Sequence, residues 1–350
     1  MPSERPNTRA EKPLLSVLRG ERCDPPPMWM MRQAGRYLPE YRQLRQEKGS
    51  FLNLVYEPNA AAEITLQPLE RFPELDGAIL FSDILIVPFA LGQNLTFVAG
   101  EGPRLTPPLA ESGIEGLTSY PARLDPIYET VRKVRGRLGA YKTLIGFAGS
   151  PWTVATYMVA GQGSRDQGET RRLAYSDPSR FGAIISRIED VTLDYLSAQI
   201  HAGVEAVQLF DSWAGSLSPA QFERWVVAPT ARIVSKLRDR HADVPIIGFP
   251  KGAGGKLAAY ARETEVSALG LDETVDPRWA AKELPSGLPV QGNLDPLALL
   301  AGGDAMDAAV RQILDAFADR PHIFNLGHGI LQETPIAHVE RLIALVKGHK

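Results

Sequence analysis

Two arginines, Arg32 and Arg36, stand four residues apart directly after the apolar run Pro27–Met31. A guanidinium can bind a carboxylate or phosphate through two parallel hydrogen bonds, and a pair separated by Gly35 can close around a ligand with several anionic groups. The alternative is an ordinary basic helix face, because residues at i and i+4 lie side by side on a helix. The position of the pair at the end of a predicted strand favours a site for a polyanion.

Two further side chains have types that suit a reactive cavity. Asp83 lies in the apolar stretch 80–88, where a carboxylate is costly unless a donor or cation meets it. An acid at a strand end can equally be a helix N-cap or the structural partner of an arginine. His328 stands between Gly327 and Gly329, where an imidazole can donate to an anion or carry a proton near neutrality.

A helix is predicted after the apolar run Leu144–Phe147, because Ser150 suits its N-cap and Pro151 its first position. We expect Tyr157 on this helix to lie near the cavity mouth, where its phenol can hydrogen-bond a ligand carboxylate. An aromatic residue at helical spacing is, however, more often part of the core. The following segment Gly161–Ser164 suits either a lid or a helix cap.

Composition limits the class of partner. The 350 residues are 44% hydrophobic and 23% charged, which suffices for a sizeable core, and the net charge of −3 argues against binding of nucleic acid or an anionic membrane. An anion must therefore be bound by a local cluster. The polar N-terminus and the absence of a long apolar run predict a cytosolic protein. Cys23 is the only cysteine and no histidine pair has ligand spacing, so we expect no metal site.

Eight short apolar runs recur along the chain and are typical of buried parallel strands. They are Pro27–Met31, Ala78–Phe81, Leu144–Phe147, Ala206–Phe210, Ile246–Phe249, Ala268–Leu271, Leu288–Gln291 and Ile323–Leu326. Helical periodicity lies between most of them, as in Phe181–Ile200, Ala220–Leu237 and Ala305–Phe317. This alternation predicts an α/β fold, a (β/α)8 TIM-type barrel. The rival is a doubly wound sheet, but no strand-linked glycine fingerprint for a dinucleotide is present.

One domain accounts for the chain. We expect a flexible N-terminal segment over residues 1–13 and a barrel over residues 14–350, with Gly100–Pro121 as a surface connection before a helix near Asp125. Pro250–Leu257 lacks the glycine spacing and the hydroxyl of a phosphate loop, so it is predicted to be a barrel loop. Chemistry in such a barrel sits at the C-terminal ends of the strands. The residues that follow the runs there include Arg32, Arg36, Asp83, Asp211, Ser212 and His328.

Several long blocks resemble the uroporphyrinogen decarboxylase family. Residues 27–40 and 146–153 resemble its two signatures, and residues 81–85, 210–215 and 325–329 resemble other blocks, with Asp211 where some members have the longer acid. The resemblance runs from about Leu14 to the C-terminus. It implies a cofactor-free, homodimeric (β/α)8 enzyme of haem and tetrapyrrole biosynthesis, which converts the four acetate side chains of uroporphyrinogen III to methyl groups and yields coproporphyrinogen III.

The resemblance also implies roles for individual residues. Asp83 would be the catalytic residue, which accepts hydrogen bonds from the pyrrole N–H groups and stabilises a cationic ring. Arg32 and Arg36 would hold carboxylates, as would a further set of residues: Tyr157, Ser212 and His328. Gln33, Ala34 and Gly35 would shape the loop between the arginines.

Three questions stay open from the sequence. The proton donor is either Arg36 acting through water, His328 or Tyr157. A second enzyme class on the same scaffold, corrinoid methyl transfer, uses zinc held by histidine and cysteines, and the single cysteine argues against it. A polycarboxylate or porphyrin binder without turnover is the third class, but such a protein would avoid Asp83 beside its arginines.

Overall fold

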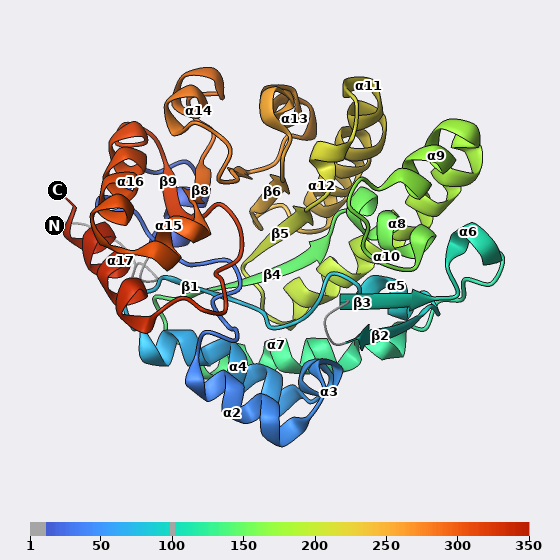
Figure 1. Ribbon diagram of the computed structural model, residues 1–350, viewed down its shortest axis with the longest axis horizontal. Coiled ribbons are helices and arrows are strands. Elements are labelled where there is room, and N and C mark those ends of the chain that lie inside the picture. Colours follow the sequence, from blue (N-terminus) through green and yellow to red (C-terminus); the bar gives the residue numbers. More distant parts are fainter. Residues whose placement is uncertain (1–11, 99–101, 350) are drawn as a thin grey trace, which may run out of the picture.

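A curved sheet of seven parallel strands forms the centre of the computed structural model, which describes residues 12–98 and 102–349, and helices surround this sheet (Figure 1). In sheet order the strands are β1 (Gly77–Ile79), β4 (Thr143–Gly149), β5 (Ala206–Asp211), β6 (Ile246–Pro250), β7 (Ala268–Gly270), β8 (Val290–Leu294) and β9 (His322–Leu326). All their residues except Phe210 are buried. A sheet covered on both faces explains why each strand reads as a continuous apolar run.

The predicted first strand is not a regular strand. Within the run Pro27–Met31, Met28 makes an isolated parallel bridge to Phe324 of β9. The Asp76 amide, just before β1, donates to the Met28 carbonyl at 2.8 Å. The run therefore lies between the two edge strands, but among the described residues the sheet itself has seven strands. The expectation of eight regular strands in a closed barrel is corrected to a curled seven-stranded α/β sheet.

Side chains explain why this run is irregular. In a regular strand the carbonyls of a neighbouring strand accept hydrogen bonds from the backbone amides. In this run, side-chain oxygens accept several of these hydrogen bonds instead. The Met28 amide donates to Asp76 Oδ2 at 2.8 Å, and the Met30 amide to Gln33 Oε1 at 3.0 Å. The Met31 amide donates to Asn325 Oδ1 at 2.9 Å. A buried amide needs an acceptor but not a ladder partner, so no strand pattern in the sequence reveals this arrangement.

A hairpin that the sequence did not predict follows β1. Strands β2 (Asn94–Val98) and β3 (Gly102–Thr106) pair antiparallel. The stretch predicted as a surface connection therefore contains a strand, followed by α6 (Leu109–Ser112) and the 3-10 turn η1 (Pro121–Leu124), while its first residue, Gly100, lies outside the described residues. Leu95 and Leu105 face each other and are buried. The Leu105 amide donates to the Gly161 carbonyl at 2.8 Å, which ties the hairpin to the C-terminal end of the later helix α8 (Pro151–Ala160).

The long helices follow the predicted periodicity. Phe181–Ile200 lies within α10 (Pro178–Ala202), Ala305–Phe317 overlaps α16 (Gly303–Ala316), and α7 (Asp125–Arg137) begins at Asp125. The stretch Ala220–Leu237 is irregular. It passes through α11 (Pro219–Phe222), a π-helical turn η3 (Glu223–Val227) and α12 (Ala228–Arg240).

Shorter helices and turns complete the covering layer. They are α1 (Pro13–Leu18), α2 (Pro39–Lys48), α3 (Phe51–Tyr56), α4 (Pro58–Arg71), α5 (Ile86–Ala90), α8 (Pro151–Ala160), α9 (Gly168–Ser176), η2 (Ala214–Ser216), η4 (Gly254–Lys256), α13 (Leu257–Thr264), α14 (Pro277–Glu283), α15 (Pro296–Ala301) and α17 (Ile336–Gly348). Most of the predicted flexible segment 1–13 lies outside the described residues, and α1 begins at Pro13. In the described part of the chain, the helices are each too short or too polar to span a membrane.

Candidate active site

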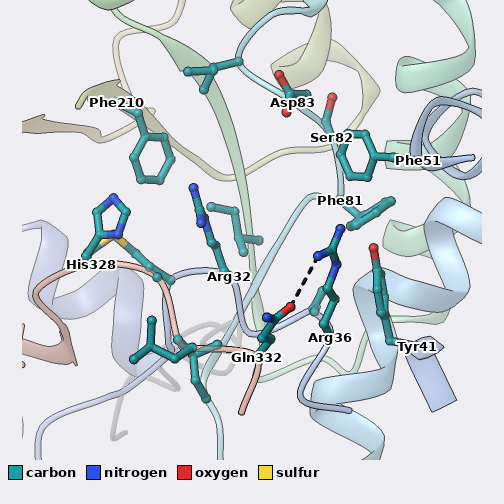
Figure 2. A pocket seen from close by; sticks show the side chains of 18 of the residues that line it. Arg32, Arg36, Tyr41, Phe51, Phe81, Ser82, Asp83, Phe210, His328 and Gln332 are labelled. Atoms are coloured by element: carbon teal, nitrogen blue, oxygen red, sulfur yellow. Dashed lines mark hydrogen bonds between the residues drawn. The ribbon is translucent and has the colours of Figure 1, made fainter. Parts of the chain in front are cut away.

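A cavity of about 960 Å³ opens at the C-terminal ends of the strands. Seven of the residues predicted for the site line it: Arg32, Ala34, Gly35, Arg36, Asp83, Ser212 and His328. Figure 2 shows Arg32, Arg36, Asp83 and His328 around this space. Two others, Gln33 and Tyr157, do not line its wall. The strand ends therefore bring together side chains that lie almost 300 residues apart in the sequence.

The two arginines lie in a turn and not on a helix, because α2 begins only at Pro39. The helix-face interpretation is therefore wrong. Arg32 has a φ of 59°, a left-handed backbone that non-glycine residues adopt only where the surroundings impose it. A Cβ at Gly35 would come within 2.8 Å of the Arg32 carbonyl oxygen, so this tight turn needs glycine there. The turn aims both guanidinium groups into one cavity.

The Arg32 side chain is held by close packing. A Cβ on Gly329 would overlap the aliphatic part of Arg32, so the arginine lies directly on the Gly329 backbone. Arg36 donates from Nη1 to Gln332 Oε1 at 3.3 Å (Figure 2), and its carbonyl accepts from Arg42 Nη1 at 3.0 Å. Packing thus restricts the stem of Arg32, and one exposed hydrogen bond orients Arg36, which lowers part of the entropic cost of binding an anion.

Gln33 supports the arginine turn from behind. It is buried, accepts from the Met30 amide and donates from Nε2 to the Gly77 carbonyl at 2.9 Å. These bonds join the turn to the first residue of β1. Gln33 thus shapes the loop, as the resemblance implied, without reaching the cavity.

Asp83 reaches the cavity from the segment after β1. Its Oδ1 accepts from the Leu85 amide at 2.8 Å, and its Oδ2 accepts no hydrogen bond from a described residue. Burial raises the pKa of this carboxyl to about 6, against the lowering effects of the Leu85 amide and of Arg32. The carboxylate is therefore ionised at neutral pH, with one oxygen available for a donor or cation in the cavity.

His328 follows β9 and lies within electrostatic reach of Arg32. Burial, together with the cationic Arg32 and Lys251, lowers the pKa of the imidazole to about 4, and Asp272 opposes this shift. With this pKa His328 is neutral near pH 7, and a neutral imidazole can still donate one hydrogen bond. It carries a proton near neutrality only once anionic groups lie beside it.

Tyr157 lies on α8, which begins at Pro151 with Ser150 at the N-cap position, as predicted. Asp83 and Arg32 are close enough to influence the pKa of its phenol, which burial raises. Tyr157 is not among the residues that line the cavity, but its phenol lies within electrostatic reach of Asp83 and Arg32. Gly161 ends this helix with a φ of 72°, so the cap interpretation of this glycine is confirmed.

Other lining residues were not selected from the sequence. Phe51 at the start of α3 packs edge-on against Phe81 and at a tilt against Phe97 of β2, with ring centroids 5.5 and 4.8 Å apart. Arg45 of α2 lies over the Phe51 ring at 5.8 Å. Phe210 lines the opposite side (Figure 2). The cavity therefore combines aromatic walls with several cations, which suits a large amphiphilic polyanion.

A second carboxyl, Asp211 at the end of β5, lies outside the cavity wall. It is almost fully buried; its Oδ1 accepts from Thr153 Oγ1 at 2.5 Å, and its Oδ2 accepts no hydrogen bond from the residues that the structure describes. Burial raises its pKa to about 7. Because the folded-state pKa lies above the usual value, the stability that this carboxyl contributes is present at acidic pH and is lost as the pH rises through about 7.

This sign predicts the behaviour of Asp211→Asn. The melting temperature of the variant relative to the unchanged protein should be more favourable at about pH 8 than at about pH 5, because only the unchanged protein must bury a charge at the higher pH. Thermal unfolding of both proteins across this range is the measurement. A difference that stays constant with pH would contradict the assignment.

Comparisons with known proteins add a family to this geometry. The family model described as "Uroporphyrinogen decarboxylase (URO-D)" matches residues 9–349. The chain is 69% identical over 337 residues to a uroporphyrinogen decarboxylase of Rhizorhabdus wittichii and 66% identical to one of Sphingopyxis alaskensis. Each alignment covers 96% of this chain and 98% of the relative.

Among solved structures, the chain is similar to a methyltransferase from Methanosarcina mazei. The TM-score is 0.80 at 18% identity, with 96% of this chain and 97% of the other covered. A B12-independent methionine synthase from Shewanella has a TM-score of 0.54 at 11% identity, with 93% of this chain and 94% of the other covered. At such identities the likeness concerns the fold alone.

Proposed function

The chain belongs to the uroporphyrinogen decarboxylase family, and on this premise we propose that it removes carbon dioxide from the four acetate side chains of uroporphyrinogen III and releases coproporphyrinogen III. The observation that carries the proposal is the 69% identity over nearly the full length of a relative of that name. The cavity supports it, because an aromatic wall with two positioned arginines suits a macrocycle that carries many carboxylates.

The chemistry requires an electron sink, because direct loss of carbon dioxide from a pyrrole acetate leaves an unstabilised carbanion. A proton added to the ring carbon turns the pyrrole into an iminium-like cation. The electrons of the breaking C–C bond then flow into this cation and leave an exocyclic methylene. That methylene takes up a proton as the ring loses one, so each step consumes one proton overall and yields a methyl group and carbon dioxide.

Asp83 is the residue we assign to the cationic stage. Its ionised carboxylate has a free oxygen in the cavity, which can accept from pyrrole N–H groups and stabilise positive charge as it grows towards the transition state. Arg32, Arg36, Ser212 and His328 bind substrate carboxylates, and we assign Tyr157 to a further substrate carboxylate, as the family resemblance implies. The positions of these groups hold the acetate above Asp83.

Which residue donates the proton depends on how the bound substrate changes the pKa values of the groups around it. Burial raises the pKa of Tyr157 and lowers that of His328 to about 4, so neither gives a proton readily at neutral pH. Substrate carboxylates beside His328 would raise the pKa of its imidazole. Arg36 remains the alternative, with a proton relayed through water.

Four further expectations join the proposal. We propose that residues 14–350 form one domain and that the run Pro27–Met31 completes a variant of the (β/α)8 barrel. The homodimer and the cytoplasmic location implied by the family also belong to this proposal.

The decisive experiment incubates the purified protein with enzymatically made uroporphyrinogen III and follows the loss of carboxylates by chromatography. Intermediates with seven, six and five carboxylates should precede coproporphyrinogen III, because each step removes one acetate carboxylate. Binding of uroporphyrinogen III without loss of carbon dioxide would replace the proposal with a binding function.

Activity should survive exhaustive chelation and dialysis, because the substrate itself supplies the electron sink and the described residues include no cluster of three or more side chains suited to a metal. The rate before and after treatment is the measurement. A reproducible loss that an added metal or nucleotide restores would overturn this expectation.

The pH profile should show the ionisation of Asp83. Because burial raises its pKa to about 6, kcat/KM should be constant above about pH 7. At lower pH it should decrease as expected for the binding of a single proton. Measurements from about pH 5 to pH 8 on the unchanged protein and on Asp83→Asn test this origin. An acid limb that persists unchanged in the variant belongs to another group.

A further inference from the structure

A second, smaller cavity of about 250 Å³ lies beside the first, and Ser212 lines both. Two cations line the smaller cavity, Arg165 from the loop after α8 and Lys251 from the end of β6. Arg165 makes no ion pair or hydrogen bond with another described residue. The smaller cavity thus offers cationic groups next to the space that accepts a polyanion.

The Lys251 backbone is fixed on both sides. Its amide donates to the Asp211 carbonyl at 3.0 Å, and its carbonyl accepts from the Gly215 amide at 2.9 Å. The ammonium Nζ lies 3.7 Å from Glu273 Oε1, a loose contact that leaves it able to turn towards a ligand. Lys251 also lies near enough to His328 to disfavour a charge on that imidazole, which places it in the same electrostatic field as the larger cavity.

The acid in the wall of the smaller cavity is already engaged. Asp272 accepts from the Thr274 amide at 2.9 Å and from the Thr274 hydroxyl through Oδ1, and from the Gly252 amide at 2.7 Å through Oδ2. Its charge therefore holds the loop and does not pair with Lys251 or Arg165.

A Cβ on Gly215 would come within 2.6 Å of the Gly252 carbonyl oxygen, so no larger side chain fits at this close approach.

We propose that Lys251 and Arg165 form a second anion subsite, which binds the carboxylate of one propionate side chain of the macrocycle. The inference rests on the proposed function. The reacting acetate must lie at Asp83, whereas the smaller cavity lies on the other side of Ser212. A propionate side chain is one methylene longer than an acetate and therefore reaches this cavity better. A propionate also persists through all four decarboxylations, so this subsite holds substrate, intermediates and product alike.

The test uses Lys251→Met and Arg165→Met, which remove the charge and keep much of the side-chain length. The control variants Lys282→Ala and Arg172→Ala each remove a cation from an exposed position that lines neither cavity. Two quantities are measured for every protein: equilibrium binding of coproporphyrinogen III without oxygen, and kcat and KM with uroporphyrinogen III. Melting temperatures show that each variant is folded.

Each subsite variant should weaken binding of coproporphyrinogen III about fivefold to tenfold and raise the KM for uroporphyrinogen III by a similar factor. The loss should shrink at high salt, and kcat at saturation should stay near the unchanged value. The controls should match the unchanged protein.

Two results would overturn the subsite. Folded variants with unaltered binding of both compounds would remove it, and a loss confined to uroporphyrinogen III would show that it holds an acetate. Failure of the proposed function is recognised separately, because the unchanged protein would then not decarboxylate uroporphyrinogen III. A Lys251-dependent affinity for coproporphyrinogen III would support the subsite even in that case.

Discussion

Asp83→Asn should lower turnover about 100- to 1,000-fold while the affinity for a non-reactive porphyrin stays level or rises. The amide keeps the size of the side chain and one acceptor, but it loses the charge that stabilises a cationic pyrrole. Removal of a negative charge also relieves repulsion with substrate carboxylates. The effect therefore falls on kcat and not on binding.

Thermal stability distinguishes this catalytic role from a structural one. The folded-state pKa of Asp83 is about 6, above its ordinary value. The carboxyl therefore stabilises the fold only at acidic pH, and that contribution is lost as the pH rises through about 6. At neutral pH the variant should melt no lower than the unchanged protein. Measuring the rate, porphyrin binding and melting temperature on one preparation distinguishes the two roles. A stable variant with normal turnover would refute the assignment.

Arg32→Lys should weaken substrate affinity by about 1–3 kcal/mol with the fold intact. Lysine keeps the positive charge but has no planar fork for two parallel hydrogen bonds to a carboxylate. Binding of a porphyrin polycarboxylate by titration measures the loss, and the melting temperature checks the fold. The position matters as well, because the guanidinium is held by contact of its stem with Gly329.

The matched control is Arg172→Lys on α9, since Arg172 is exposed and lines neither cavity. It should bind the porphyrin as the unchanged protein does. Equal affinity in Arg32→Lys and in the control would remove the arginine clamp from the account.

The arginine turn shows how far sequence patterns reached. The apolar run Pro27–Met31 and the two arginines after it located one wall of the cavity correctly. The pattern could not reveal that the side chains of Asp76 and Asn325 satisfy the backbone of this run. Those contacts join segments that are distant in the chain, so the run was predicted as a regular strand.

The hairpin and the aromatic wall were missed for a related reason. Strands β2 and β3 are only partly buried and β3 contains Pro103, so they lack the continuous apolar run that marks the buried central strands. Phe51 and Phe97 have no distinguishing local motif, because an aromatic residue looks the same in a core and in a cavity wall. Only the packing of α3 against β2 places them together.

The sequence alone determined the α/β class, the location of seven central strands and the residues at their ends, because buried parallel strands need continuous apolar runs and chemistry needs particular side chains. The tertiary structure decided where those side chains lie and which charge they carry. It brings Asp83 and His328 to one cavity, sets their pKa values at about 6 and about 4, and turns Gln33 away from the space that its neighbours line. These properties arise from burial and from the close approach of segments that are far apart in the chain. A local sequence pattern reveals neither of them.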